Sequence, residues 1–289
     1  MRAAIFGLAL ATLALALVAT ATGTPSQPAQ SGSCAKASLD LTKDGQLTLG
    51  TDNPAFPPWW GGAAKKPWQI SNPASGQGYE SAVAYAVAKQ LGFAKGQVEW
   101  IHVKFAQSYR PGKKPFDWYM AQVSYTPERD KAVDFSNAYY FVNQALVARD
   151  GTAIASAKTR ADLRPYRLGA QLGTTSYQFI TDQIRPDSKP FAYPTNDLAV
   201  QALKNGQIDG IVVDLPTAFF VTAVQVEDGV IVGQFPNRGK REHFGMVFET
   251  GSTLKRCVNR ALNTLWSNGT IKKIQTRWLS QSAGAPVIR

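Results

Sequence analysis

The sequence predicts an α/β protein with two lobes, each built on a mostly parallel sheet flanked by helices. Short strands rich in β-branched residues alternate with amphipathic helices, a pattern typical of parallel sheets covered on both faces. The alternation occurs once in residues 46–105 and again in residues 167–213. The 289 residues, 44% of them hydrophobic, are enough to bury a sizeable core in one large domain or two ordinary ones.

The first half begins with alternating residues at 46–51, which predict a strand ending at Asp52. Residues 53–60 hold too many prolines for a regular element, so we expect an aromatic loop at the carboxyl end of a strand, where open α/β sheets bind ligands. Residues 80–91 have helical spacing and precede Gly92. The next strand is expected at 98–105.

In the second half the elements follow in the same order. We expect strands at 144–148, 167–171, 207–213 and 244–248, and helices at 176–184, 197–203, 254–266 and 271–279, with one further helix starting at Pro216. A tight turn, residues 172–175, precedes the first of these helices. Thr174 or Thr175 suits its N-cap, and free N–H groups there favour an anionic group.

The N-terminal residues indicate export. Residues 1–21 are almost entirely small and apolar after Arg2 and end in Ala-Thr-Ala, which predicts a cleaved signal peptide; an uncleaved membrane anchor is the alternative. Residues 22–37 read as a flexible linker. In an exported chain Cys34 and Cys257 are expected to form a disulfide, with lipid attachment at Cys34 as the other possibility.

The net charge is +11, of which the segment before Cys34 contributes only Arg2. The basic residues are scattered and form no platform interleaved with aromatic residues, so we expect no nucleic-acid partner.

Catalytic and metal motifs are missing from the sequence. The two histidines, His102 and His243, stand at no metal-ligand spacing, and no nucleophile elbow, phosphate loop or dinucleotide pattern is present. We therefore expect no metal, no cofactor and no enzyme activity.

Instead, complementary polar groups occur in loops and at strand ends. Arg129 offers a planar fork for a carboxylate, Ser124 a hydroxyl, Thr174 a backbone N–H, and Asp214 an acceptor for an ammonium group. Together these groups describe a site for an α-amino acid. Taken singly, Arg129 would also suit a surface ion pair with Glu128 or Asp130, and Asp214 a helix N-cap.

Several further residues are candidates for the pocket. Backbone groups at Gln122 complete the first-half site, and Phe56 is expected to face the ligand, whereas Trp60 is expected in the core. Asp52 and Glu80 are available as a base or as partners for a cationic ligand side chain.

The run Ser124-Tyr-Thr-Pro-Glu-Arg129, followed by Val133-Asp-Phe-Ser136 and Tyr139-Tyr140, resembles the bacterial extracellular solute-binding protein family 3, the substrate-binding proteins of polar amino-acid ABC importers. Gly50-Thr-Asp52, Gly78-Tyr-Glu80, Leu172-Gly-Thr-Thr175 and Gln207-Ile-Asp-Gly210 through Asp214 follow the family order. The resemblance covers about residues 45–282.

The resemblance implies a type II periplasmic-binding-protein fold with lobe 1 at 38–138 plus 245–289, lobe 2 at 144–239, and hinges at 139–143 and 240–244. It implies that Arg129, Ser124 and the Thr174 N–H hold an α-carboxylate, that Asp214 holds an α-ammonium, and that Phe56 covers the side chain. Three departures affect the side-chain pocket: a first loop one residue longer than usual, Gln122 at a normally small position, and Gln171 at a position that varies with specificity.

This family membership would make the chain an exported monomer at the periplasmic or extracellular face, which captures a free amino acid and passes it to an ABC permease. An enzyme on the same fold, either dehydratase-like or lytic for cell walls, and a purely sensory receptor are the alternatives.

Overall fold

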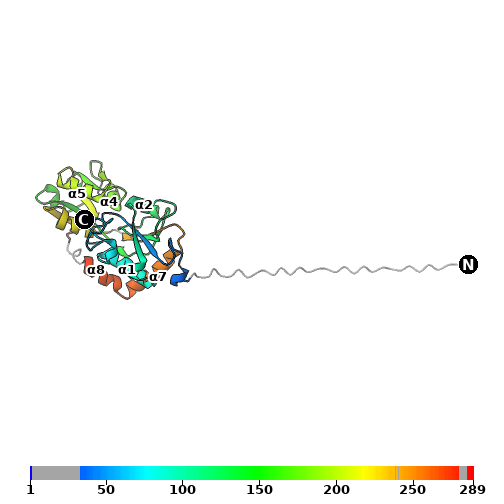
Figure 1. The fold of residues 1–289 in the computed structure, drawn as a ribbon. Coiled ribbons are helices and arrows are strands. Elements are labelled where there is room, and N and C mark those ends of the chain that lie inside the picture. The colour runs from blue at the N-terminus through cyan, green and yellow to red at the C-terminus, as the bar shows by residue number, and fades with distance from the viewer. Residues whose placement is uncertain (2–32, 238, 240, 280–284) are drawn as a thin grey trace. The chain divides into compact units, whose positions relative to one another are not determined.

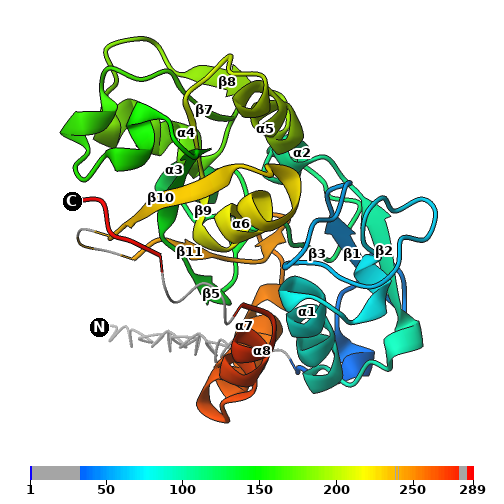
Figure 2. The same ribbon diagram turned by 90° about the vertical axis from the view of Figure 1, so that its left-hand side faces the viewer.

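The two predicted halves are present in the computed structural model as two five-stranded sheets, connected through a pair of short strands (Figures 1 and 2). The structure describes residue 1 and residues 33–237, 239, 241–279 and 285–289. Apart from Met1, the predicted signal peptide lies outside the described residues, and so does most of the predicted linker. Among the helices that are described, none is long and apolar enough to cross a bilayer.

The first sheet has the strand order β2-β1-β3-β12-β4. Its strands are β1 (Leu47–Thr51), β2 (Val98–His102), β3 (Trp118–Tyr119), β4 (Asp134–Phe135) and β12 (Val247–Phe248). The helices of this lobe are α1 (Tyr79–Gln90), α2 (Phe105–Ser108), α3 (Pro127–Asp130), α7 (Leu254–Ser267) and α8 (Thr270–Leu279). Helices α1, α7 and α8 contact one another and cover one face of the sheet (Figure 2). We call this sheet with its helices lobe 1.

The second sheet, with its helices, forms lobe 2 and has the order β10-β6-β9-β7-β8. Its strands are β6 (Gln144–Arg149), β7 (Leu168–Gln171), β8 (Phe191–Tyr193), β9 (Gly210–Asp214) and β10 (Gly229–Phe235). Its helices are α4 (Thr175–Phe179), α5 (Asn196–Lys204) and α6 (Leu215–Phe220), and single π-helical turns, Ile180–Ile184 and Val221–Gln225, extend α4 and α6. Along β6, Ala145 and Val147 enter one apolar core while Leu146 and Ala148 enter the other. This period of two shows that both faces of the sheet are covered.

Both sheets are mixed, whereas the sequence pattern predicted mostly parallel ones. Strand β1 is parallel to β2 and β3, and β7 is parallel to β8 and β9. Strand β12 is antiparallel to β3 and β4, and β6 is antiparallel to β9 and β10. The difference arises because β6 and β12 carry the chain into each lobe from the connection, opposite in direction to the strands of the β-α-β units.

The two connecting segments lie side by side. Strand β5 (Tyr140–Phe141) pairs with β11 (His243–Phe244) in an antiparallel ribbon, with Phe244 opposite Tyr140. These strands fall inside the two segments predicted as hinges. Segments about one hundred residues apart in sequence are thereby held next to each other.

The last five residues, which the sequence analysis assigned to lobe 1, pack on lobe 2 (Figure 2). Ile288 is buried in the lobe 2 core, and its N–H donates to Gln234 O at 2.9 Å while Gln234 N donates to Pro286 O at 2.7 Å. Gly233 leaves room for the tail, because a Cβ at this position would lie 2.8 Å from Ile288. The tail therefore adds to the edge of β10.

At the other end of the described chain, Cys34 forms the predicted disulfide with Cys257 on α7. The bond fastens the start of the described chain to lobe 1. It also occupies the thiol that lipid attachment would need.

Candidate functional site

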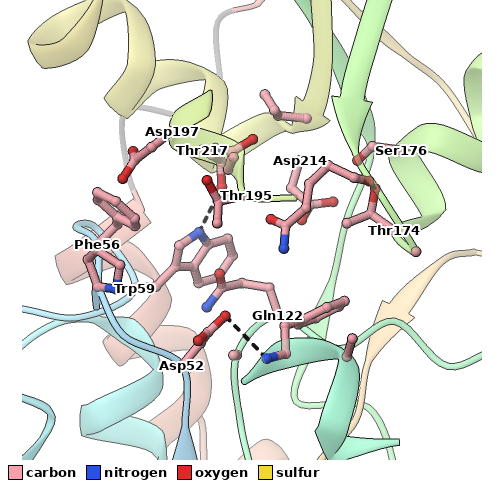
Figure 3. Close-up of a pocket in the computed structure, with 18 of the residues that line it drawn as sticks. Asp52, Phe56, Trp59, Gln122, Thr174, Ser176, Thr195, Asp197, Asp214 and Thr217 are labelled. Carbon is pink, nitrogen blue, oxygen red and sulfur yellow. Dashed lines mark hydrogen bonds between the residues drawn. The ribbon is translucent and has the colours of Figure 1, made fainter. Parts of the chain in front are cut away.

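A cavity of about 540 Å³ lies between the lobes, at the carboxyl ends of β1, β7 and β9 (Figure 3). Most of the predicted site residues line it: Asp52, Phe56, Gln122, Ser124, Arg129, Gln171, Thr174, Thr175 and Asp214. Glu80 is the one predicted residue that does not. Sequence reasoning also missed several lining residues: Trp59, Phe105, Tyr109, Thr195, Asp197, Thr217, Phe220 and Gln225.

Arg129 is positioned by the Thr126-Pro127 turn that starts α3. Thr126 is the N-cap and its hydroxyl accepts the Arg129 N–H at 3.2 Å, while Pro127 occupies the first turn, where its missing N–H costs nothing. The short helix α3 thus fixes the direction in which the Arg129 side chain points from the backbone.

Arg129 is 9% exposed, and its guanidinium bridges the lobes. It donates to Ser124 O at 2.6 Å in lobe 1 and to Gly173 O at 2.8 Å in lobe 2, and it lies 4.6 Å from the centre of the Tyr109 ring. Burial lowers the pKa of Arg129, while Tyr109 and the nearby carboxylates Glu242 and Asp214 oppose the shift. The guanidinium stays charged even when it is buried. It has five N–H donors, of which these two hydrogen bonds use only two, so donors remain for a ligand. No ion pair with Glu128 or Asp130 is present in the described part of the chain.

Ser124 also meets both lobes. Its hydroxyl donates to Glu242 Oε1 at 2.7 Å and lies 3.3 Å from Thr175 Oγ1. The Ser124 hydroxyl is the donor of this bond, so its hydrogen points to Glu242. The hydroxyl oxygen is therefore left as an acceptor.

Thr174 is the N-cap of α4, as predicted. Its hydroxyl accepts the Tyr177 N–H at 3.2 Å and donates to Gln171 O at 2.7 Å. The preceding Gly173 has φ = +77°, and a Cβ there would lie 2.8 Å from the Tyr109 hydroxyl. The positive φ of the turn therefore favours glycine, and the absence of a Cβ lets the Tyr109 hydroxyl of lobe 1 come close.

Asp214 occupies the N-cap position of α6, but its side chain makes no capping bond. Instead its Oδ1 accepts from Gln144 Nε2 at 2.9 Å, and the same nitrogen donates to Glu242 Oε2 at 3.1 Å. Burial raises the pKa of Asp214 well above its usual value, and the Glu242 carboxylate raises it further. A cation placed here would neutralise two neighbouring carboxylates. Glu242 lies in the predicted hinge segment, but nothing in the sequence pattern marked it.

Glu80 lies behind the cavity wall. It is fully buried, accepts the Gln122 N–H at 2.7 Å, and also accepts hydrogen bonds from the Gln122 side chain and the Tyr139 hydroxyl. Burial raises its pKa to about 7, although these hydrogen bonds oppose the shift. Gln122 has φ = +52° and folds back over Glu80. A glutamine at a position expected to be small therefore separates Glu80 from the cavity.

The aromatic first loop reaches lobe 2. Trp59 is 1% exposed, and its Nε1 donates to Thr217 Oγ1 on α6 at 3.0 Å. The Phe56 ring lines the cavity with its centre 5.9 Å from that of Phe220. Trp60 packs into the lobe 1 core against Trp100, as predicted.

Asp52 supports its own lobe. Its oxygens accept the N–H groups of Asn53 at 2.9 Å and Phe105 at 3.2 Å, and His102 Nε2 lies 3.4 Å away. The strand predicted for 98–105 ends at His102, and Phe105 instead begins α2. The Asp52 side chain therefore holds in place the connection between β2 and α2.

This arrangement of two lobes around a charged cavity is that of a solute-binding protein. The family model for bacterial extracellular solute-binding proteins, family 3, matches residues 61–281, so the chain belongs to this family.

Relatives within the family include the ABC transporter arginine-binding protein 1 of Escherichia coli, 30% identical over 212 residues that cover 71% of this chain and 82% of the relative. The arginine-binding extracellular protein ArtP of Bacillus subtilis is 26% identical over 228 residues, covering 74% and 82% of the two chains.

Among solved structures, an ancestral arginine-binding protein bound to glutamine matches with a TM-score of 0.65 and 28% identity, over 82% of this chain and 99% of that one. The ancestral amino acid-binding protein AncCDT-1, a precursor of cyclohexadienyl dehydratase, matches with a TM-score of 0.65 and 28% identity, over 81% and 95%.

Proposed function

We propose that this protein is exported, captures one free α-amino acid between its lobes and delivers it to an ABC permease. The observation that carries this proposal is the placement of a buried arginine, Arg129, and a half-buried aspartate, Asp214, in one cavity lined from both lobes. Arg129 supplies donors for a carboxylate, and Asp214 supplies acceptors for an ammonium group. The arginine-binding relatives and the family membership support the same role.

In this proposal the α-carboxylate lies against the Arg129 guanidinium, near the turn that holds Thr174. The α-ammonium lies against Asp214 and the Ser124 hydroxyl oxygen, because the Ser124 hydrogen is directed to Glu242. This assignment moves Ser124 from the carboxylate, where the family resemblance placed it, to the ammonium.

Ligand capture requires the lobes to move. We place the hinges in the β5–β11 ribbon, where the connecting segments pair. Arg129–Gly173 and Trp59–Thr217 are contacts between lobes that would form on closure. Closing of two lobes around a ligand is a common mode of domain movement in proteins of this architecture.

A binding role fits the site better than an enzymatic one. Glu80, the carboxyl group whose pKa of about 7 would suit a general base, is separated from the cavity by Gln122. Incubation of the protein with the amino acids that bind it should leave them chemically unchanged by mass spectrometry. A chemically altered amino acid would instead favour an enzyme. This alternative is suggested by the likeness to a precursor of cyclohexadienyl dehydratase.

Thermal unfolding with each common amino acid tests the proposal. A ligand at about 100 times its dissociation constant adds about 2.7 kcal/mol to the free energy of unfolding. Arg129→Ala should abolish the shift in melting temperature, because the carboxylate loses its charged partner. Arg167→Ala, which removes an arginine paired with Asp209 in lobe 2, is the control and should keep the shift. If no amino acid raises the melting temperature of the native protein, the proposal fails.

A further inference from the structure

The cavity extends beyond the groups that would hold an α-amino acid. Phe56 and Asp197 lie on one side of the cavity in Figure 3, away from Thr174, Ser176 and Asp214 on the other. We call the part of the cavity formed by Phe56, Thr195, Asp197, Phe220 and Gln225 the side-chain end. The part formed by Ser124, Arg129, Thr174 and Asp214 is the α-amino end.

Asp197 has hydrogen-bonding capacity to spare. Its Oδ1 accepts from Gln225 Nε2 at 3.0 Å, and in the described structure Oδ2 has no hydrogen bond and the carboxylate no ion pair. Partial burial raises its pKa, with the Gln225 bond opposing the shift. The helix α5 does not need it as a cap, because the Thr195 hydroxyl accepts the Leu198 N–H at 3.3 Å. Asp197 is therefore a half-buried carboxylate that lines the cavity and has no ion-pair partner among the described residues.

Asp52, the other carboxylate near the ligand side chain, differs in this respect. Both of its oxygens accept backbone N–H groups of lobe 1, and His102 stands beside it. Lys104 also lines the cavity, but no ion pair joins it to Asp197 among the described residues. Of these two carboxylates, Asp197 is therefore the one that is available to pair with a cationic group of the ligand.

We infer that Asp197 determines specificity: its free oxygen accepts hydrogen bonds from the cationic end of the bound amino acid's side chain. The inference rests on the proposed function and adds a substrate class, cationic α-amino acids. The Phe56 and Phe220 rings, one from each lobe, suit the apolar stem and the flat face of such a side chain. A neutral ligand would desolvate the Asp197 Oδ2 atom without giving it a charged hydrogen-bond donor, which is unfavourable.

Arginine and citrulline make the sharpest pair of probes, because citrulline replaces the guanidinium with a neutral group of similar shape. By isothermal titration calorimetry, the native protein should bind arginine about 10- to 100-fold more tightly than citrulline, the range expected for hydrogen bonds to a charged group. Asp197→Asn should lose most of this preference by weakening arginine alone. Asp197→Glu, which keeps the charge, should retain a preference for arginine.

Two controls separate the Asp197 effect from a general one. Asp182→Asn removes an exposed carboxylate of lobe 2 that does not line the cavity and should leave both affinities unchanged. Asp52→Asn should change the two affinities by a similar factor, because Asp52 supports the wall of lobe 1.

Three outcomes would overturn the inference. Equal affinities of the native protein for arginine and citrulline would reject it while leaving amino-acid capture intact, and this comparison needs no variant to fold. An unchanged ratio in Asp197→Asn would likewise remove Asp197 as the determinant. Failure of the native protein to bind any amino acid would reject both the inference and the proposed function.

Discussion

The two ends of the cavity are built in different ways. At the α-amino end a network of hydrogen bonds joins the two lobes: Arg129 donates to Ser124 O and Gly173 O, and Gln144 Nε2 bridges Asp214 and Glu242. At the side-chain end the walls are aromatic and a single carboxylate, Asp197, has one partner. A fixed α-amino end suits features that all amino acids share, whereas a sparsely bonded side-chain end can select among them. The difference indicates that affinity and specificity arise in separate parts of one cavity.

The largest effect should follow from Asp214→Asn, which removes the proposed partner of the α-ammonium. Removing one member of a buried charge pair costs about 2 to 5 kcal/mol, so affinity for every amino acid should fall by about 30-fold or more. Because the change lies at the α-amino end, calorimetry should show the same factor for arginine and citrulline. If only one of the two ligands lost affinity, Asp214 would contribute to side-chain specificity, and the two ends of the cavity would not be separate in function.

A smaller effect on binding is expected for Glu80→Gln, since Glu80 lies behind the cavity. Its effect should instead be on stability. The folded-state pKa of about 7 is raised above the usual 4.5, so the folded state holds more protons than the unfolded state between these values, and stability falls as pH rises from about 4.5 to 7. This group accounts for about 3 kcal/mol of that decline.

Denaturant unfolding at several pH values checks this prediction. The Glu80→Gln variant should show a shallower loss of stability between pH 4.5 and 7, with affinity for arginine within about threefold of the native protein. A large loss of affinity would place Glu80 in the site after all. An unchanged pH profile would mean that the pKa of Glu80 is the same in the folded and the unfolded protein.

Much of lobe 1 and of the α-amino end could be predicted from local sequence. The alternation at 46–51 predicted β1, and Asp52 follows at its end. The β9 strand likewise delivers Asp214 to the cavity. These features depend on residues within a few positions of one another, which is why propensity and spacing reveal them.

The features that were missed depend on contacts distant in sequence. Ser124 and Glu242 are 118 positions apart, and Trp59 and Thr217 are 158 apart. The direction of β6 and β12, and the packing of the C-terminal tail on β10, follow from the path of the chain between lobes. The sequence predicts Asp197 only as the start of a helix, because no neighbouring residue indicates that this helix begins at a cavity.

The most direct test of the two-ended cavity is a crystal structure of the protein with arginine bound. We expect the α-carboxylate on Arg129, the α-ammonium between Asp214 and the Ser124 oxygen, and the guanidinium within hydrogen-bond distance of Asp197. Arginine bound in the reverse direction, or with its guanidinium away from Asp197, would contradict this prediction.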